Sequence, residues 1–318
     1  MEFKRSHFNP QGRTLADGRI VCDFAKQGDA AASNYVYDDA LVLAVNVALA
    51  AHRPLLLAGE PGCGKTTLAA NVARVLGWAY YQHTIASRSQ AGELVWEVDT
   101  LGRLNDAYDP QRRLLGEEYY VQPGKLWWAL APQSAHHRGL SLSPADAEQH
   151  SVKFPAGHLE SAGAVLLIDE IDKAEPDLPN DLLEVLDTRS FDVKAARIEA
   201  ERAQGLIVIT TNLERELPGA FMRRCVVYRF PDAGEGWFSG IALQRIGGLG
   251  ETLAKQVEKR LLEHRQEART RGQRVPGTAE YLDAITALQA LEVRDENAPA
   301  WLQVERCIFG KHAALEQS

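Results

Sequence analysis

Eight residues, starting at Gly59, have the spacing of a phosphate-binding loop. The run from Gly59 to Thr66 reads GEPGCGKT and fits the pattern GxxxxGK[ST]. An apolar stretch at 54–58 precedes it and predicts a buried strand, and 67–76 follows and predicts a helix. In this order the glycines let successive backbone N–H groups face a polyphosphate at a helix N-terminus.

The pattern assigns a role to each polar residue of the loop. We expect the Lys65 ammonium to contact the β- and γ-phosphates of ATP and the Thr66 hydroxyl to bind Mg²⁺. The residues expected to contact nucleotide are Glu60, Pro61, Gly62, Cys63, Gly64, Lys65, Thr66 and Thr67.

Two carboxylates follow a second apolar run, 164–168, which reads AVLLI. An unbroken run of this kind is typical of a strand buried on both faces of a parallel sheet. Its carboxyl end carries Asp169, expected to hold Mg²⁺, and Glu170, expected to take a proton from the attacking water. The plainer interpretation is a strand that ends in surface acids.

Three further polar residues follow later strands. Asn212 stands two residues after the apolar run 206–210, and its amide could align the attacking water. Arg223 and Arg224 stand before the last predicted strand, as an arginine finger or as surface charges. A finger there lies too far from its own loop to reach the γ-phosphate. This hypothesis therefore requires a neighbouring subunit, an Arg224 not buried in its own body, and room for an anion at Lys65.

Length and periodicity predict the domain organisation. The 318 residues suffice for one large domain and a smaller one. We expect an extension over 1–33, an α/β nucleotide-binding domain over 34–231 and a helical lid over 232–318, where apolar residues recur at helical spacing. The predicted fold is a P-loop αβα sandwich with a parallel sheet.

Charge and cysteine usage narrow the partners. The net charge of -8 and the pI near 5.7 argue against sequence-independent binding of nucleic acid, although Arg88, Arg103, Arg112 and Arg113 could form a local basic stripe. Four separated cysteines show no ligand or disulfide spacing, and no apolar run is long enough to cross a bilayer. We expect a cytoplasmic protein that does not bind membranes.

Three segments between the predicted strands are read as insertions or loops. Alternating apolar residues predict hairpin-like insertions at about 92–108 and 188–203. Residues 132–160 are rich in His, Ser and Pro and predict a surface loop.

Taken together, the motifs GEPGCGKT, VLLIDE, TTN and MRRC resemble those of AAA+ ATPases, and the insertions are similar to those of the MoxR branch and its dynein-related relatives. The resemblance implies a ring, usually a hexamer, with ATP between subunits. Lys65 and Thr66 match Walker A, Asp169 and Glu170 match Walker B, Asn212 matches the first sensor, and Arg224, with Arg223 as the alternative, matches the finger. No arginine starts the late lid helix at 276–280, so either another lid arginine, such as Arg271 or Arg274, serves as the second sensor, or closure of the lid is sensed differently.

Three functions remain open at this level. The first is remodelling of a protein client, in MoxR-like proteins usually with a partner that contains a von Willebrand A domain. The second is an ATPase in a bacterial defence or signalling assembly. The third is a nucleic-acid translocase resembling the McrB-type restriction motors, which DNA or RNA should stimulate at low salt.

Overall fold

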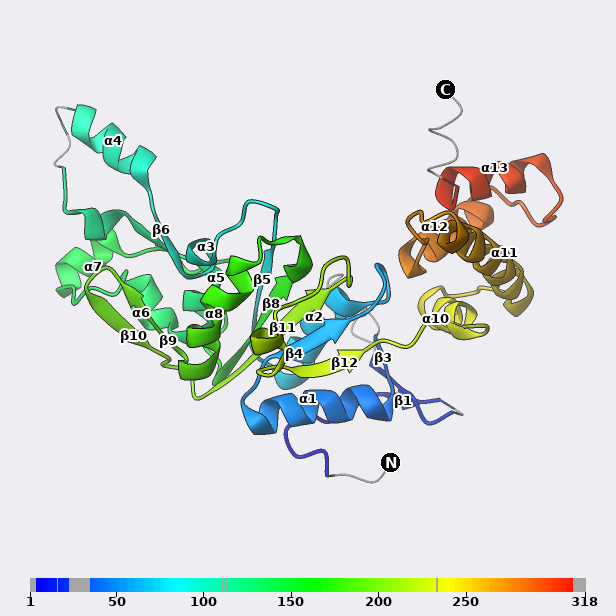
Figure 1. Cartoon of the computed structure of the whole chain (residues 1–318), viewed down its shortest axis with the longest axis horizontal. Helices are drawn as coiled ribbons and strands as arrows, with labels where there is room; N and C mark the ends of the chain where they lie inside the picture. The colour runs from blue at the N-terminus through cyan, green and yellow to red at the C-terminus, as the bar shows by residue number, and fades with distance from the viewer. Residues whose placement is uncertain are drawn as a thin grey trace. The chain divides into compact units, whose positions relative to one another are not determined.

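The computed structural model describes residues 4–15, 17–22, 35–109, 111, 114–232 and 234–310, and the chain divides into two compact units (Figure 1). The first unit comprises Met1–Ala58 and Thr66–Tyr228, and the second comprises Gly59–Lys65 and Arg229–Ser318. This division differs from the predicted ranges in one respect that matters below, because seven residues of the phosphate loop group with the C-terminal helices.

The first unit is built on a five-stranded sheet with the order β12 (Val226–Arg229), β4 (Leu55–Ala58), β11 (Gln204–Thr211), β8 (Gly163–Asp169) and β5 (Ala79–Thr84). The registers pair Thr211 with Ala58 and Ile209 with Ile168, all in parallel. Thr84 pairs with Asp169 in the same sense. The carboxyl ends of these strands therefore meet at one edge, as the sequence predicts.

Both faces of the sheet are buried. Successive side chains of a strand point to opposite faces. One set packs with the helices α5 (Lys125–Leu130) and α8 (Asp177–Thr188) and includes Leu56, Leu166, Ile168 and Ile209. The alternate residues Leu55, Leu57, Val165 and Leu167 are also buried, and α1 (Asp39–Ala51) contacts β4 and β11. The predicted αβα class is confirmed.

The insertion at 188–203 forms the expected hairpin, since β9 (Ser190–Val193) and β10 (Ala196–Glu199) pair antiparallel. The hairpin prediction for 92–108 is wrong. That segment forms α3 (Ala91–Val95), β6 (Trp96–Val98) and α4 (Thr100–Tyr108), and β6 pairs with the distant β7 (Val121–Pro123). The reason is Asp99, whose carboxylate accepts the Gly102 N–H at 2.7 Å and starts a helix instead of a turn.

The loop predicted over 132–160 contains two short helices, α6 (Pro132–His136) and α7 (Pro144–His150). Ser143 caps α7 by accepting the Asp146 N–H at 3.2 Å, and proline stands in the first turn of both helices. A 3₁₀ helix, η2 (Glu117–Tyr120), leads into β7. Arg112 and Arg113 of the predicted basic stripe lie outside the described residues.

Part of the N-terminal extension packs on the first unit. The strands β1 (Arg13–Thr14), β2 (Ile20–Cys22) and β3 (Tyr35–Tyr37) pair antiparallel. Phe8 is buried, and the Asn46 side chain of α1 donates to the Phe8 carbonyl at 2.7 Å. This segment therefore belongs to the body in its described part.

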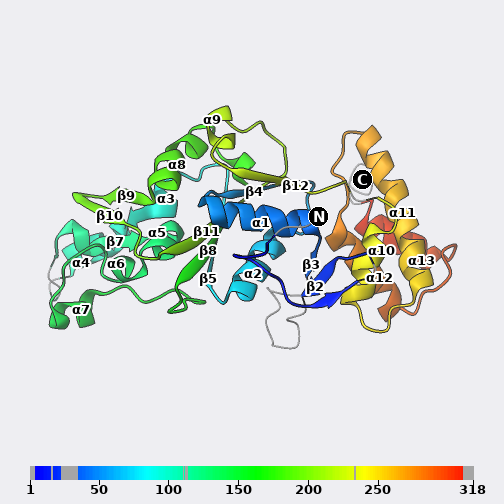
Figure 2. The ribbon, with the colours of Figure 1, turned by 90° about the horizontal axis from the view of Figure 1, so that it is seen from below.

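The second unit contains α10 (Trp237–Arg245), α11 (Glu251–Thr270), α12 (Thr278–Ala290) and α13 (Pro299–Ile308) (Figure 2). Their apolar stripes meet in one core that includes Phe238, Leu261, Tyr281 and Trp301. The helical periodicity predicted for this region is confirmed. No helix among the described residues is long and apolar enough to cross a membrane.

Candidate nucleotide site

Asp169 lies at the carboxyl edge of the sheet and is held by two hydroxyl groups. It is buried, and its carboxylate accepts the Thr66 hydroxyl at 3.0 Å and the Thr210 hydroxyl at 2.5 Å. Thr66 comes from the first turn of α2 (Lys65–Leu76), which follows the phosphate loop. The structure thus brings together the two residues predicted to bind Mg²⁺.

The donor set fits that ion. Mg²⁺ prefers oxygen ligands and is usually bound through one or two carboxylates together with water and substrate phosphates. Over the described ranges no group of three or more His, Cys, Asp or Glu side chains could hold a metal. Thr66 and Asp169 would be the protein ligands of the ion, and phosphate oxygens would complete the shell.

Glu170 adopts a left-handed backbone conformation directly after β8, with φ 62°. Non-glycine residues rarely occupy this region, and such outliers gather at functional sites. One carboxylate oxygen lies 3.4 Å from the Asn212 amide and the other 2.5 Å from the Lys173 ammonium. The predicted base and the predicted water-aligning amide are thus adjacent.

Two charged residues at this edge were missed by the sequence analysis. Lys173 pairs with Glu170, and that hydrogen bond raises the pKa of Lys173. Asp172 is buried, and one of its oxygens accepts the N–H groups of Asn212 at 2.9 Å and Glu214 at 3.0 Å. Asp172 therefore fixes the backbone that carries Asn212. Its only sequence signal is its position three residues after Asp169.

The phosphate loop itself folds back on Lys65. The Lys65 side chain is buried, and its ammonium donates to the carbonyls of Gly59 at 2.6 Å and Glu60 at 2.9 Å. Gly62 and Gly64 both have positive φ, 79° and 98°, which favours glycine at these positions. Of the other predicted contacts, Pro61, Cys63 and Thr67 are half-buried. Burial raises the pKa of the Cys63 thiol, although Lys65 opposes the shift.

Glu60 is bound by two arginines of α11. Arg269 donates to one carboxylate oxygen at 2.7 Å, and the buried Arg265 donates to the other and to the Pro276 carbonyl before α12. Burial works against ionisation of Glu60, but the hydrogen bonds from Arg269 and Arg265 outweigh it and lower the pKa. We call Glu60, Arg265 and Arg269 the Glu60 clamp.

The arginines expected to contact the loop from the lid do not do so. Arg271 pairs with Glu267 at 3.8 Å, and Arg274 pairs with Glu280 at 3.0 Å. Glu267 belongs to α11 and Glu280 to α12, and both arginine side chains are exposed. The lid arginines that contact the loop are those of the Glu60 clamp, which stand two and six residues before Arg271.

Arg224 and Arg223 lie beside the amino end of β4. The Val226 N–H donates to the Pro54 carbonyl, and the Arg53 side chain donates to the Arg223 carbonyl, each at 2.8 Å. By register, Asp169 lies roughly 10 Å farther along the strands than Pro54 and two strands, roughly 10 Å, across. The Arg224 side chain is 37% exposed and pairs with Asp187 of α8 at 2.5 Å. The structure thus does not bring either arginine to the acids of its own sheet.

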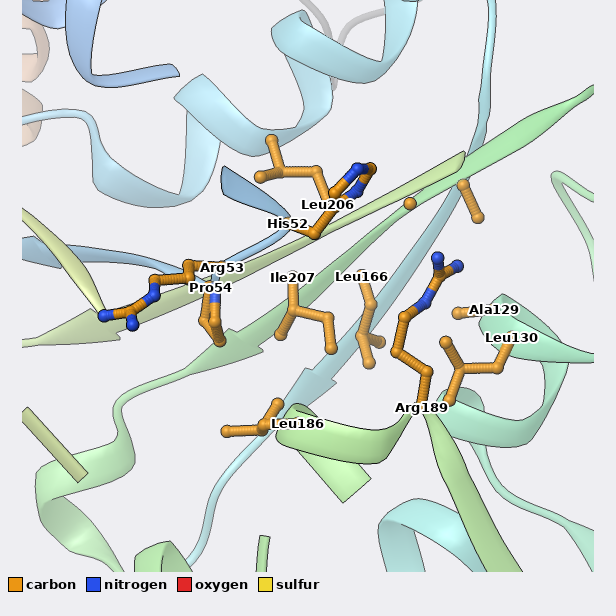
Figure 3. Close-up of a pocket in the computed structure, with 12 residues that line it drawn as sticks. His52, Arg53, Pro54, Ala129, Leu130, Leu166, Leu186, Arg189, Leu206 and Ile207 are labelled. Carbon is orange, nitrogen blue, oxygen red and sulfur yellow. The ribbon is translucent and has the colours of Figure 1, made fainter. Parts of the chain in front are cut away.

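A small pocket lies at the amino ends of the strands, away from Asp169 (Figure 3). It has a volume of about 30 Å³ and is lined mainly by apolar residues at the start of β4, β8 and β11. Ligands of parallel α/β sheets bind outside the carboxyl ends of the strands, and a volume of this size holds about one water molecule. This pocket is therefore not the nucleotide site.

The parallel sheet, the glycine loop and the strand-tip acids define a P-loop NTPase of the αβα class. Comparison with known proteins narrows this class. Residues 54–225, more than half of the chain, match the AAA domain of the dynein-related subfamily. The chain belongs to this family and is an ATP hydrolase that uses ATP with Mg²⁺.

Individual relatives are more distant. The chain is 26% identical over 265 residues to a mitochondrial Lon protease homolog of Phaeodactylum tricornutum. That alignment covers 78% of this chain but only 25% of the relative, so the chain spans about a quarter of its length. A mutant RuvB of Thermotoga maritima has a TM-score of 0.46 at 15% identity, covering 86% of this chain and 71% of that one. The RuvB Holliday junction branch migration motor of the same organism has a TM-score of 0.43 at 15% identity, covering 83% and 66%.

Proposed function

We propose that the chain is a subunit of a MoxR-like ATPase ring, with six copies expected, that remodels or activates a protein client. The observation that carries the ring is the position of Arg224, exposed beside the amino end of β4 and away from Asp169 of its own sheet. An arginine finger supplied by a neighbour is worth 10³ or more in turnover. In a ring, Arg224 could reach the γ-phosphate of ATP bound to the neighbouring subunit, which it cannot do within its own subunit.

The proposed chemistry uses the residues at the sheet edge. Thr66 and Asp169 would hold Mg²⁺, which would neutralise charge on the β- and γ-phosphates. Glu170 accepts a proton from the attacking water, and Asn212, whose amide lies 3.4 Å from Glu170, orients the same water. Arg224 of the neighbour, or Arg223 in its place, stabilises the charge that develops on the γ-phosphate.

Lys65 must exchange partners in this scheme. Its ammonium donates to the carbonyls of Gly59 and Glu60, and in the nucleotide-bound state it donates to phosphate oxygens. The Glu60 clamp keeps the carboxylate of Glu60 on α11. The acid therefore stays turned to its two arginines and does not pair with the Lys65 ammonium.

A protein client, with a partner that contains a von Willebrand A domain, rests on the MoxR resemblance. The name of the Lon protease homolog, a protein-degrading enzyme, is consistent with a protein client. The cytoplasmic location is part of the proposal and rests on the four free cysteines.

The experiment uses E170Q, which should bind ATP without turning it over. With ATP and Mg²⁺, light scattering of E170Q should show an oligomer. Affinity capture with E170Q should enrich the same protein client in repeated preparations. The control is E216Q, which changes an exposed acid and should release the client as ATP is consumed. A monomer under all nucleotide conditions contradicts the ring. Stimulation of ATP hydrolysis by DNA that is lost at high salt would instead favour the translocase.

A further inference from the structure

The two arginines that precede β12 differ in how their side chains are held. Arg224 donates from Nε to the Asp187 carboxylate at 2.5 Å and from Nη1 to the Ala220 carbonyl at 3.1 Å. Arg223 is exposed, and its side chain makes no hydrogen bond or ion pair with the residues that the structure describes. Asp187 therefore distinguishes Arg224 from its neighbour in the chain.

Both members of this ion pair stand beside buried residues. Asp187 lies in the last turn of α8, directly after the buried Leu186. Arg224 follows α9 (Gly219–Met222), and its N–H donates to the carbonyl of the buried Phe221 at 3.0 Å. Leu186 and Phe221 belong to the same apolar core, and α8 contacts α9 (Figure 2). Packed backbone therefore sets the positions of the carboxylate and the guanidinium.

The contacts of Arg224 leave part of its guanidinium available. A guanidinium carries five N–H donors in a fixed plane. Arg224 uses donors on Nε and Nη1, and its Nη2 has no partner in the described part of the chain. The side chain is 37% exposed, so a group from outside the subunit can approach it. A phosphate oxygen can therefore accept from Nη2 while both existing contacts remain.

An alternative is that Asp187 withholds the arginine from an incoming phosphate. The Asp187 side chain is 46% exposed, and an exposed ion pair shifts an equilibrium by about fivefold at most. A finger arginine contributes 10³ or more in turnover, so this competition is too weak to prevent its contact. Ordering a free arginine side chain costs roughly tenfold in an equilibrium. Arg224 is already ordered before a phosphate arrives, which favours orientation as the role of Asp187.

We propose that Asp187 is a positioning residue, which orients Arg224 in preference to Arg223 toward the γ-phosphate bound to a neighbouring subunit. The inference rests on the ring proposed above. Asp187 acts only through Arg224, and the ion pair lies on the subunit that supplies the finger. Loss of Asp187 should therefore impair the neighbour's site and leave the nucleotide site of its own subunit intact.

The kinetics of single variants test this role. D187A should lower kcat by about tenfold, because Arg224 must then be ordered during the reaction, and should change ATP affinity less than about twofold. D187N should keep most of the activity, since its amide oxygen still accepts the Nε–H of Arg224. The matched control is E184A, which removes an exposed ion pair with Arg197 one turn earlier on α8 and should behave as wild type.

Mixtures of full-length variants show on which subunit Asp187 acts. E170Q retains both Asp187 and Arg224, so it should supply an oriented arginine to D187A subunits. An equal mixture of the two should be several times more active than the sum of the two alone. R224A supplies no arginine, so its mixture with D187A should only equal that sum. A defect of D187A in its own nucleotide site would give the reverse pattern.

The outcomes separate this inference from the ring itself. If E170Q and R224A do not restore each other's activity, the ring is wrong and the inference fails with it. If they do, three results overturn the role of Asp187 alone: D187A as active as E184A, D187A faster than wild type, or the reverse mixing pattern. Wild-type ATP binding verifies that D187A is folded. If it is not, D187S replaces it, because the serine hydroxyl is too short to reach Nε of Arg224.

Discussion

The strand-tip acids and the Glu60 clamp each involve a residue of the motif GEPGCGKT, Thr66 in the first case and Glu60 in the second, but they are positioned in different ways. Asp169 and Glu170 end one strand, and the parallel register brings them beside Thr66, Thr210 and Asn212. Glu60 is instead held by arginines 205 and 209 positions later in the chain. A charge placed by strand register can be predicted from a short motif, whereas one placed by a distant helix cannot.

Substitutions at the strand tip and in the Glu60 clamp should also have different effects. Glu170 is 30% exposed and its partner Lys173 is 43% exposed, so loss of that charge should not unfold the protein. Arg265 is only 4% exposed and depends on Glu60. Removal of a carboxylate from a buried guanidinium leaves an uncompensated charge. We therefore expect substitutions at the strand tip to affect turnover and substitutions in the clamp to affect stability.

The largest effect is expected for E170Q. Loss of the general base should lower kcat by about 10³-fold, with ATP affinity nearly unchanged. Steady-state phosphate release and a fluorescent nucleotide titration measure the two quantities. E216Q, an exposed acid outside the site, should behave as wild type. Equal loss of binding and turnover would mean that Glu170 shapes the site and does not act as the base.

In the clamp, E60A should lower the free energy of unfolding by about 2–3 kcal/mol, because Arg265 stays buried without its carboxylate. Urea unfolding followed by tryptophan fluorescence measures this change. E251A removes an exposed pair with Lys255 and is the matched control, expected to show no change. Wild-type stability in E60A would break the proposed difference between the two regions.

The clamp should also make stability depend on acid pH. The pKa of Glu60 is lower in the folded protein than in the unfolded chain, so its contribution is present above the ordinary glutamate value and is lost as the pH falls through the folded value. Urea midpoints measured between about pH 7 and pH 3 should therefore fall more steeply for the wild type than for E60Q. Parallel curves would show that Glu60 is not bound as described.

The smallest effect is expected for R269A. This arginine is 48% exposed, and its pair with Glu60 is screened by solvent, so the loss in stability should stay below about 1 kcal/mol. R265A should cost more, since it removes the buried member and the bond to the Pro276 carbonyl. Equal losses in the two variants, read from the same urea curves, would remove burial as the explanation.

The sequence predicts the sheet edge well because the loop and the acids each follow directly on a strand of the same parallel sheet. It fails at 92–108, where alternation correctly marks Trp96–Val98 as a strand but does not reveal that the partner strand is Val121–Pro123. It also fails to choose among the lid arginines. Arg265, Arg269, Arg271 and Arg274 all lie near the end of α11, and only packing shows which two face Glu60.

The central claim is that Arg224 acts on the nucleotide of a neighbouring subunit, and mixing two inactive variants tests it most directly. E170Q and R224A should each lose about 10³-fold in turnover while still binding ATP. Mixed in equal amounts, they should regain activity well above the sum of the two alone, because some interfaces then join an intact Glu170 to an intact Arg224 of the adjacent subunit. A mixture no more active than that sum, or an R224A variant that turns over ATP at the parent rate, would contradict the account.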